Sequence, residues 1–172
     1  MSTSFKRSMK IISAGLAVAA LAGCGSGNEP IGALGDPTAR IELAMPLAFA
    51  NYSAPIIPFT AAAPSITLTY SVPSQPITAP AAGIVTAADI ASGTVTIFHN
   101  THLTTTLVGV GSLLFRVGDF VTAGQQIGTI ATFLNLKVST VQDGVAVCPQ
   151  SFLNSADRIQ LASKTTTGNP CQ

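Results

Sequence analysis

The stretch Phe115-Arg-Val-Gly-Asp-Phe-Val-Thr-Ala-Gly-Gln-Gln-Ile-Gly-Thr-Ile130 decides the fold, because turn glycines and apolar residues recur in it at a fixed spacing. Gly118-Asp119 and Ala123-Gly124 stand where the backbone must bend or take a positive φ. The apolar residues around these turns are expected to be buried: Val117, Val121 and Ile127. The stretch therefore predicts two short strands that meet at a tight corner.

A second stretch upstream, Pro76-Ile-Thr-Ala-Pro-Ala-Ala-Gly-Ile-Val-Thr86, has the same organisation. Pro80 is admissible only on a sheet edge or at a strand start, and Gly83 is expected to form the corner before the next strand. Between the two stretches lie Gly93-Thr-Val-Thr-Ile-Phe-His99 and a Thr-rich run. From Ile66 onward, strands are expected every eight to twelve residues or so, with one short helical stretch over 149–156. The expected class is all-β.

The order of these motifs resembles the LytM or lysostaphin-type peptidoglycan metallopeptidases over roughly residues 67–152. From His99 to Asp119 the chain keeps the usual spacing of this family without a gap. The positions that carry the resemblance are Pro80, Gly83, His99, Gly118, Asp119, Gly124, Gln125 and Gly128. The resemblance implies a compact antiparallel β domain of the barrel-sandwich hybrid type, also called a duplicated hybrid motif.

The zinc ligands of this family do not carry over to the chain. The family holds zinc with a His and an Asp from a motif upstream of the "APxxG" strand and a His from a late "HxH" strand, and two further histidines assist the attacking water. Upstream of Pro76 the chain has no His, and residues 65–75 contain no carboxylate. Gly109 falls at the "YxHL" histidine, and Phe133 and Asn135 fall at the "HxH" positions. The resemblance thus implies a degenerate site without catalytic residues or cofactor.

The loop that normally precedes the late strand is also shortened, since only residues 129–132 separate Gly128 from Phe133. His99 and His102 are the only imidazoles, and a rebuilt metal site would need further ligands from carboxylates elsewhere. The candidate carboxylates are Asp89, Asp119 and Asp143. The sequence favours the other interpretation, in which His99 is a structural residue of its strand and His102 a solvated turn residue. No Lys lies between Cys24 and Lys137, which excludes a lipoyl-type carrier.

The N-terminus has the pattern of a bacterial signal peptide. Three basic residues precede a twelve-residue apolar run, Ile11–Ala22, which is too short to span a bilayer. The sequence Leu21-Ala22-Gly23-Cys24 resembles a lipobox, which implies cleavage before Cys24 and lipidation of its thiol. Gly25 suggests sorting to the outer membrane, facing the periplasm. The alternatives are an ordinary secretion signal or a short uncleaved anchor.

Once Cys24 is assigned to the lipid, Cys148 and Cys171 form an even pair and are a disulfide candidate, with two free thiols as the alternative. We expect a signal peptide over 1–23, a lipidated tether and extended segment over 24–65, the LytM-like β domain over 66–154 and a C-terminal tail over 155–172. Within the tether, residues 41–49 alternate in hydropathy and are expected to lie on the domain, with a mobile linker as the alternative.

After cleavage the chain would carry five basic and seven acidic residues, a net charge of −2, without any basic cluster. This charge balance argues against nucleic acid as a partner. The sequence predicts a non-catalytic, lipid-anchored envelope protein, attached to the membrane by its lipid, whose domain binds peptidoglycan or an envelope protein. Two alternatives remain: a zinc endopeptidase with a rebuilt site, and a structural subunit or adaptor of an envelope complex.

Overall fold

The structure is a computed structural model of the chain, and it describes residues 41–172 except 52–54, 71 and 100–101. The signal segment, Cys24 and the first part of the tether lie outside the described residues. Eight strands form one sheet: β1 (Ile66–Thr69), β2 (Pro76–Thr78), β3 (Gly83–Asp89), β4 (Thr94–Phe98), β5 (Leu103–Val110), β6 (Phe120–Val121), β7 (Gln126–Thr140) and β8 (Ala146–Val147). The pairs between these strands are antiparallel, which confirms the predicted all-β class.

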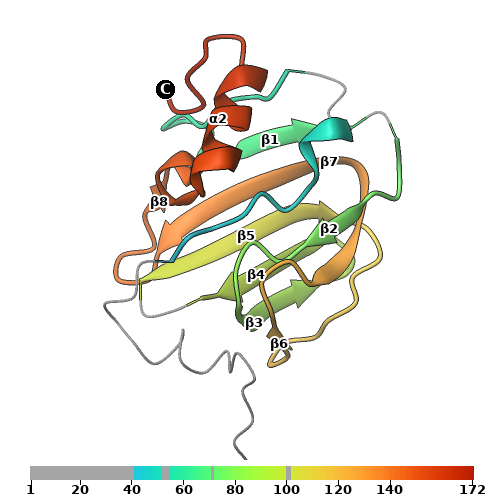
Figure 1. Cartoon of the computed structure of the whole chain (residues 1–172). Helices are drawn as coiled ribbons and strands as arrows, with labels where there is room; N and C mark the ends of the chain where they lie inside the picture. Colours follow the sequence, from blue (N-terminus) through green and yellow to red (C-terminus); the bar gives the residue numbers. More distant parts are fainter. Residues whose placement is uncertain (1–40, 52–54, 71, 100–101) are drawn as a thin grey trace, which may run out of the picture.

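The sheet is open (Figure 1). Its strand order is β1-β7-β5-β4-β3-β6, and β2 and β8 pair with β7 as well. Closure into a barrel would require β1 and β6 to pair, yet they stand at opposite ends of this order and β6 has only two residues. The barrel expected from the resemblance is therefore wrong in this respect, while the compact antiparallel domain is confirmed.

Strand β7 runs for 15 residues and organises the sheet. Its first part pairs with β2, and its second part pairs with β1, β5 and β8. Only four residues separate Gly128 from Phe133, and β7 continues without interruption through the place where the family has a loop. The predicted loss of that loop is confirmed.

The corner around residues 115–130 forms as expected at its two turn glycines. Gly118 has φ +94° and Gly124 has φ +75°. Their N–H groups donate to the carbonyls of Val85 (2.8 Å) and Ala79 (2.9 Å), which fastens the corner to the strands upstream. Val121 and Ile127 are buried, but Val117 is 62% exposed. The expectation for Val117 is wrong because this residue lies in the turn before Gly118, ahead of the first residue of β6.

The two upstream motif residues, Pro80 and Gly83, are both buried. Pro80 lies between β2 and β3, where its carbonyl accepts a hydrogen bond from Ala44 N (2.8 Å). Gly83 is the first residue of β3, and its φ is not positive. A Cβ at Gly83 would clash with Phe98 O and Ile97. The glycine is thus required for close packing rather than for a left-handed corner.

One face of the sheet is buried, and an extended segment covers it. In residues 41–49, the side chains of Leu43, Met45 and Leu47 are buried in the core, as the alternation in hydropathy predicts. In Figure 1 this segment crosses the sheet in front of β7. Leu43 donates its N–H to Phe152 O (2.7 Å), and Leu43 O accepts from Asn154 N (3.0 Å). A 3-10 helix, Phe49–Asn51, follows it.

The C-terminal segment, expected as a tail, contains a helix. After a 3-10 helix, Pro149–Phe152, the α-helix α2 (Ser155–Lys164) begins at an Asn154 side chain that accepts from Asp157 N (2.8 Å). Asp157 Oδ2 accepts from Met45 N (2.7 Å), and Leu161 is buried in the core. The helix thus packs with residues 41–49 on the covered side of the sheet (Figure 1). Within the described residues, no helix is long and apolar enough to span a membrane.

Candidate functional site

The uncovered face of the sheet brings together the positions where the resemblance places metal-site residues. Cross-strand pairing sets Thr67 opposite Asn135 and Thr69 opposite Phe133 on β1 and β7. On the other side of β7, Asn135 lies opposite Val108 of β5, and Gly109 follows in a bulge beside Phe133. We call the outward-facing residues of β1, β7, β5 and β4 the open face. Its members are Thr67, Thr69, Phe133, Asn135, Lys137, Ser139, Thr104, Thr106, Val108, Thr94, Thr96 and Phe98.

The open face has hydroxyl and amide groups where a zinc site needs imidazole and carboxylate. The strand upstream of Pro76 that pairs with β7 along this face is β1, and its outward residues are threonines. Thr67 Oγ1 donates to Asn135 Oδ1 at 2.7 Å, and this bond leaves the amide N–H groups of Asn135 for other partners. Phe133 is 43% exposed and presents its apolar ring. In the described part of the chain, no three His, Cys, Asp or Glu residues gather to hold a metal ion.

His99 is buried on the other face, with both ring nitrogens engaged. Nδ1 lies 2.9 Å from Ala82 O, and Nε2 lies 2.8 Å from Thr105 Oγ1. Because the carbonyl can only accept, Nδ1 carries the proton and Nε2 accepts from the hydroxyl. Burial lowers the pKa of His99, against an opposing contribution from the Ala82 carbonyl. A neutral imidazole with both nitrogens occupied is a structural group, not a metal ligand.

His102 and the three candidate carboxylates do not complete a metal site either. His102 is exposed in the bend directly before β5. Each carboxylate serves its own turn: Asp89 accepts from Ser92 Oγ (2.7 Å), Asp119 from Arg116 N (2.7 Å) and Asp143 from Thr140 Oγ1. These hydrogen bonds lower the pKa values of Asp89 and Asp143, with Ser92 and Thr140 the largest causes. The two aspartates are thus stabilised as anions within local turns.

Lys137 is a residue of the open face that the motif comparison missed. It follows Asn135 by two positions on β7 and therefore points to the same face, opposite Thr106 of β5. Among the described residues its ammonium has no hydrogen-bond or ion-pair partner. The period-two rule applied to β7 could have identified it, because an outward Asn135 implies an outward Lys137.

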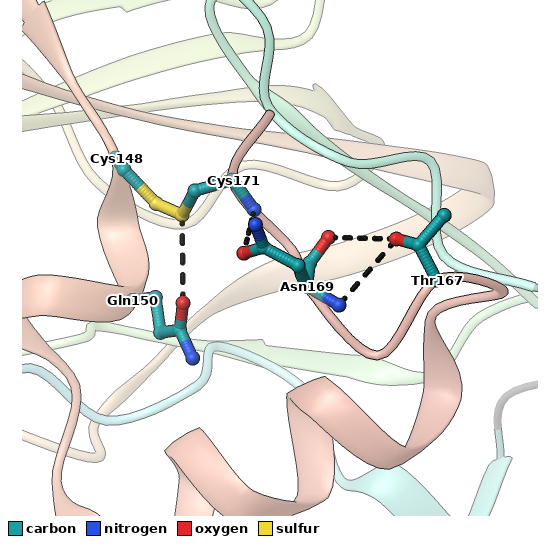
Figure 2. The surroundings of a disulfide bond; sticks show 5 residues. All are labelled: Cys148, Gln150, Thr167, Asn169 and Cys171. Carbon is teal, nitrogen blue, oxygen red and sulfur yellow. Dashed lines mark hydrogen bonds between the residues drawn. A yellow bond between two sulfur atoms is a disulfide. The ribbon is translucent and has the colours of Figure 1, made fainter.

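The predicted disulfide between Cys148 and Cys171 is present, with the two Cα atoms 5.9 Å apart (Figure 2). Gln150 lies beside the disulfide, and hydrogen bonds between residues close in sequence hold the turn before Cys171. Cys171 N donates to Asn169 Oδ1 (3.0 Å), and Thr167 Oγ1 donates to Asn169 O (3.1 Å). The backbone of Cys171 also pairs with that of Phe59 in an isolated β-bridge, so the C-terminus is held by the disulfide to Cys148 and by backbone pairing to Phe59.

Residues 66–147 match the family model described as peptidase family M23. This match agrees with the LytM-type family that the motif spacing implied, over a little less than half of the chain. No curated protein sequence matches the chain significantly.

Solved structures with the same fold include Csd3 of Helicobacter pylori, with 18% identity and a TM-score of 0.57 over 67% of this chain and 34% of that chain. A putative peptidase M23 from Pseudomonas aeruginosa has 22% identity and a TM-score of 0.54 over 70% and 53% of the two chains. A chain of the SpoIIQ–SpoIIIAH pore forming complex has 18% identity and a TM-score of 0.53 over 70% and 94%. The match thus spans about a third of Csd3. At these identities the comparison shows a common fold.

Proposed function

We propose that the protein is a non-catalytic, lipid-anchored cell-envelope protein whose M23 domain serves as a binding module for peptidoglycan or an envelope protein. The observation that carries the proposal is the hydrogen bond between Thr67 and Asn135. It joins the strand upstream of Pro76 to the late strand, the two elements from which the family draws its ligands. A polar pair of this kind offers hydrogen bonds to a ligand but cannot hold zinc.

The other residues of the open face also favour binding over hydrolysis. Zinc acidifies its bound water only when three protein ligands hold it and leave one position open. Gly109 has no side chain, and Phe133 presents an apolar ring. An uncovered sheet face with hydroxyl, amide and aromatic groups can still contact a peptide or glycan along its length.

A second candidate function is a structural subunit of an envelope assembly. The relative that supports it is the SpoIIQ–SpoIIIAH structure, which is described as a pore forming complex and shares the fold over 94% of its chain. In that case the open face or the sheet edge would contact another protein, and isolated peptidoglycan would not be bound.

The test uses the mature chain from residue 24 onward, incubated with purified peptidoglycan and excess zinc. Muropeptide release, bound metal and sedimentation with the peptidoglycan are measured together. We expect sedimentation without cleavage and without stoichiometric zinc. Zinc-dependent cleavage that is lost in both His99→Ala and His102→Ala would overturn the proposal in favour of a rebuilt endopeptidase site.

The anchor is tested separately, in cells that express the full chain. Labelling with a radioactive fatty acid should mark the protein and should fail in Cys24→Ser, which should accumulate as the precursor or in soluble form. Unchanged membrane fractionation and unchanged gel mobility of Cys24→Ser would contradict lipidation.

A further inference from the structure

The open face carries one charged side chain at its centre, and this charge has no counterion among the described residues. Lys137 lies on β7 between Asn135 and Ser139, with Thr106 opposite it on β5. Its side chain is partly buried by its neighbours. An ammonium that is partly withdrawn from water loses solvation, and an anionic ligand can restore that interaction.

Threonine and serine residues are the neighbours of Lys137 in the strand pairing, whereas Asp89 and Asp143 belong to turns at the ends of the sheet. Thr106 Oγ1 and Thr96 Oγ1 lie 3.1 Å apart, and Thr104 Oγ1 donates to Ser139 O (3.4 Å). Asp89 and Asp143, at the ends of the sheet, accept hydrogen bonds within the loops that follow β3 and β7. The open face therefore carries one positive charge, and none of its members is a carboxylate.

The number of cations on the open face indicates which kind of anionic ligand it can bind. Arg116, Arg158 and Lys164 lie outside the strands of the open face, in a turn or on α2. Recognition of a polyanion requires several clustered cations. A single ammonium complements a single negative charge, and a carboxylate is the singly charged anion that peptides carry.

Phe133, on the same strand, adds a second requirement for the ligand: an apolar group at a fixed distance from its carboxylate. Phe133 precedes Lys137 by four residues and points to the same face, a separation of about 13 Å along the strand. Its exposed ring can pack against an apolar group. An extended peptide of about four residues covers this distance, with its carboxylate at Lys137 and an apolar side chain or methyl group near Phe133.

We infer that the open face binds the free C-terminal carboxylate of a short, extended peptide, with Lys137 as the carboxylate-binding residue and Phe133 as the apolar contact. The inference rests on the proposed binding function and identifies its ligand class. Thr67 and Asn135, between these two contacts, provide hydrogen bonds to the peptide backbone. The open face then distinguishes a peptide that ends in a carboxylate from one whose terminus is linked or amidated.

The experiment compares acetyl-Ala-Ala-Ala with its C-terminal amide, titrated at millimolar concentrations against the isotope-labelled mature chain that carries Cys24→Ser. Amide resonances report binding. We expect the acid to shift resonances of β5 and β7 and to bind about threefold to fivefold more tightly than the amide. The preference should fall when salt is raised.

Variants test whether Lys137 causes the preference for the peptide acid over its amide. Lys137→Gln should bind the acid and the amide equally, while Lys137→Arg should keep the preference. The matched control is Lys164→Gln on α2, which removes an equal charge outside the open face and should leave the preference unchanged. Because Lys137 lies on the outer face, the shifts of buried residues also show that each variant is folded.

Equal binding of acid and amide, no binding of either, or a preference that persists in Lys137→Gln would each overturn the inference. Zinc-dependent release of muropeptides would instead overturn the proposed function. A protein that sediments with peptidoglycan yet shows no preference for the acid would refute the carboxylate site alone.

Discussion

The carbonyl oxygen of Phe133 occupies the space that a side chain on Gly109 would need. Gly109 also has φ +101°, a backbone conformation that residues with a Cβ rarely adopt. The bulge between Val108 and Val110 brings these two backbones together. The position that the family gives to an imidazole is thus closed by the backbone itself, and not only by the loss of one side chain.

Gly109→Ala should therefore destabilise the domain by about 3 kcal/mol, because the strain of the left-handed conformation adds to a clash with backbone that cannot rotate away. The matched control is Gly118→Ala. Gly118 has a similar φ of +94°, but nothing lies within 4 Å of its Cβ position, so its loss should be about 1 kcal/mol. Chemical denaturation of both variants measures the difference, and equal losses would show that the contact with Phe133 is unimportant.

The corner at residues 115–130 could be predicted from sequence because its signals are local. Gly118 and Gly124 adopt the positive φ that turn chemistry demands, and Val121 and Ile127 are buried as alternation requires. The same rule misplaced Val117, since alternation does not say where a strand begins. Positive φ at Gly109 could not be predicted, because it depends on a bulge against Phe133 of β7, which is 24 residues away in sequence.

Helix α2 could not be predicted from apolar periodicity. Leu161 is its one buried residue, while Ile159 is 70% exposed, so the apolar residues define no continuous stripe. Its position depends on polar contacts, chiefly the Asn154 cap and the bond between Asp157 and Met45 N. Lys137 was missed for another reason: the motif comparison considers only the positions where ligands are expected.

Removal of the disulfide should destabilise the domain by about 3 kcal/mol. The bridge joins residues 23 positions apart, and the loop it closes restricts the unfolded chain. The variant Cys148→Ala/Cys171→Ala should therefore melt at a lower temperature than the oxidised parent. Reductant should lower the melting temperature of the parent and leave that of the variant unchanged. A parent that melts identically with and without reductant would contradict a stabilising role for the bridge.

Stability should fall as the pH drops below about 6.5, because burial lowers the pKa of His99 in the folded state. The sign follows from proton binding. Below pH 6.5 the unfolded chain binds a proton at this imidazole while the folded chain does not, so protons favour unfolding. The slope should approach about 1.4 kcal/mol per pH unit until the lowered folded pKa is reached.

Denaturation at a series of pH values measures this dependence. His99→Gln should lower the stability at neutral pH and flatten the slope in the acid range, since glutamine does not titrate there. His102→Gln is the control for the loss of an imidazole, because His102 is exposed. An equally steep acid slope in His99→Gln would assign the effect to other groups.

Restoring single ligand residues should not restore a zinc hydrolase. Asn135→His would supply one imidazole on the open face, but its neighbour on β1 is Thr67, and one ligand holds zinc too weakly to acidify its water. The informative variant is Thr67→Asp/Asn135→His. Thr67 and Asn135 form a cross-strand pair whose side chains already meet at 2.7 Å, so this change sets a carboxylate beside an imidazole.

The double variant should bind zinc weakly and still release no muropeptides. A third ligand is missing, and the Phe133 carbonyl bars a histidine from position 109 without movement of β5 against β7. Bound zinc after dialysis and muropeptide release are measured for both single variants, the double variant and the parent. Zinc binding in the double variant alone would support the assignment of Thr67 and Asn135 to the former metal face. Cleavage by Asn135→His alone would show that the chain supplies the remaining ligands itself, and the non-catalytic function would have to be abandoned.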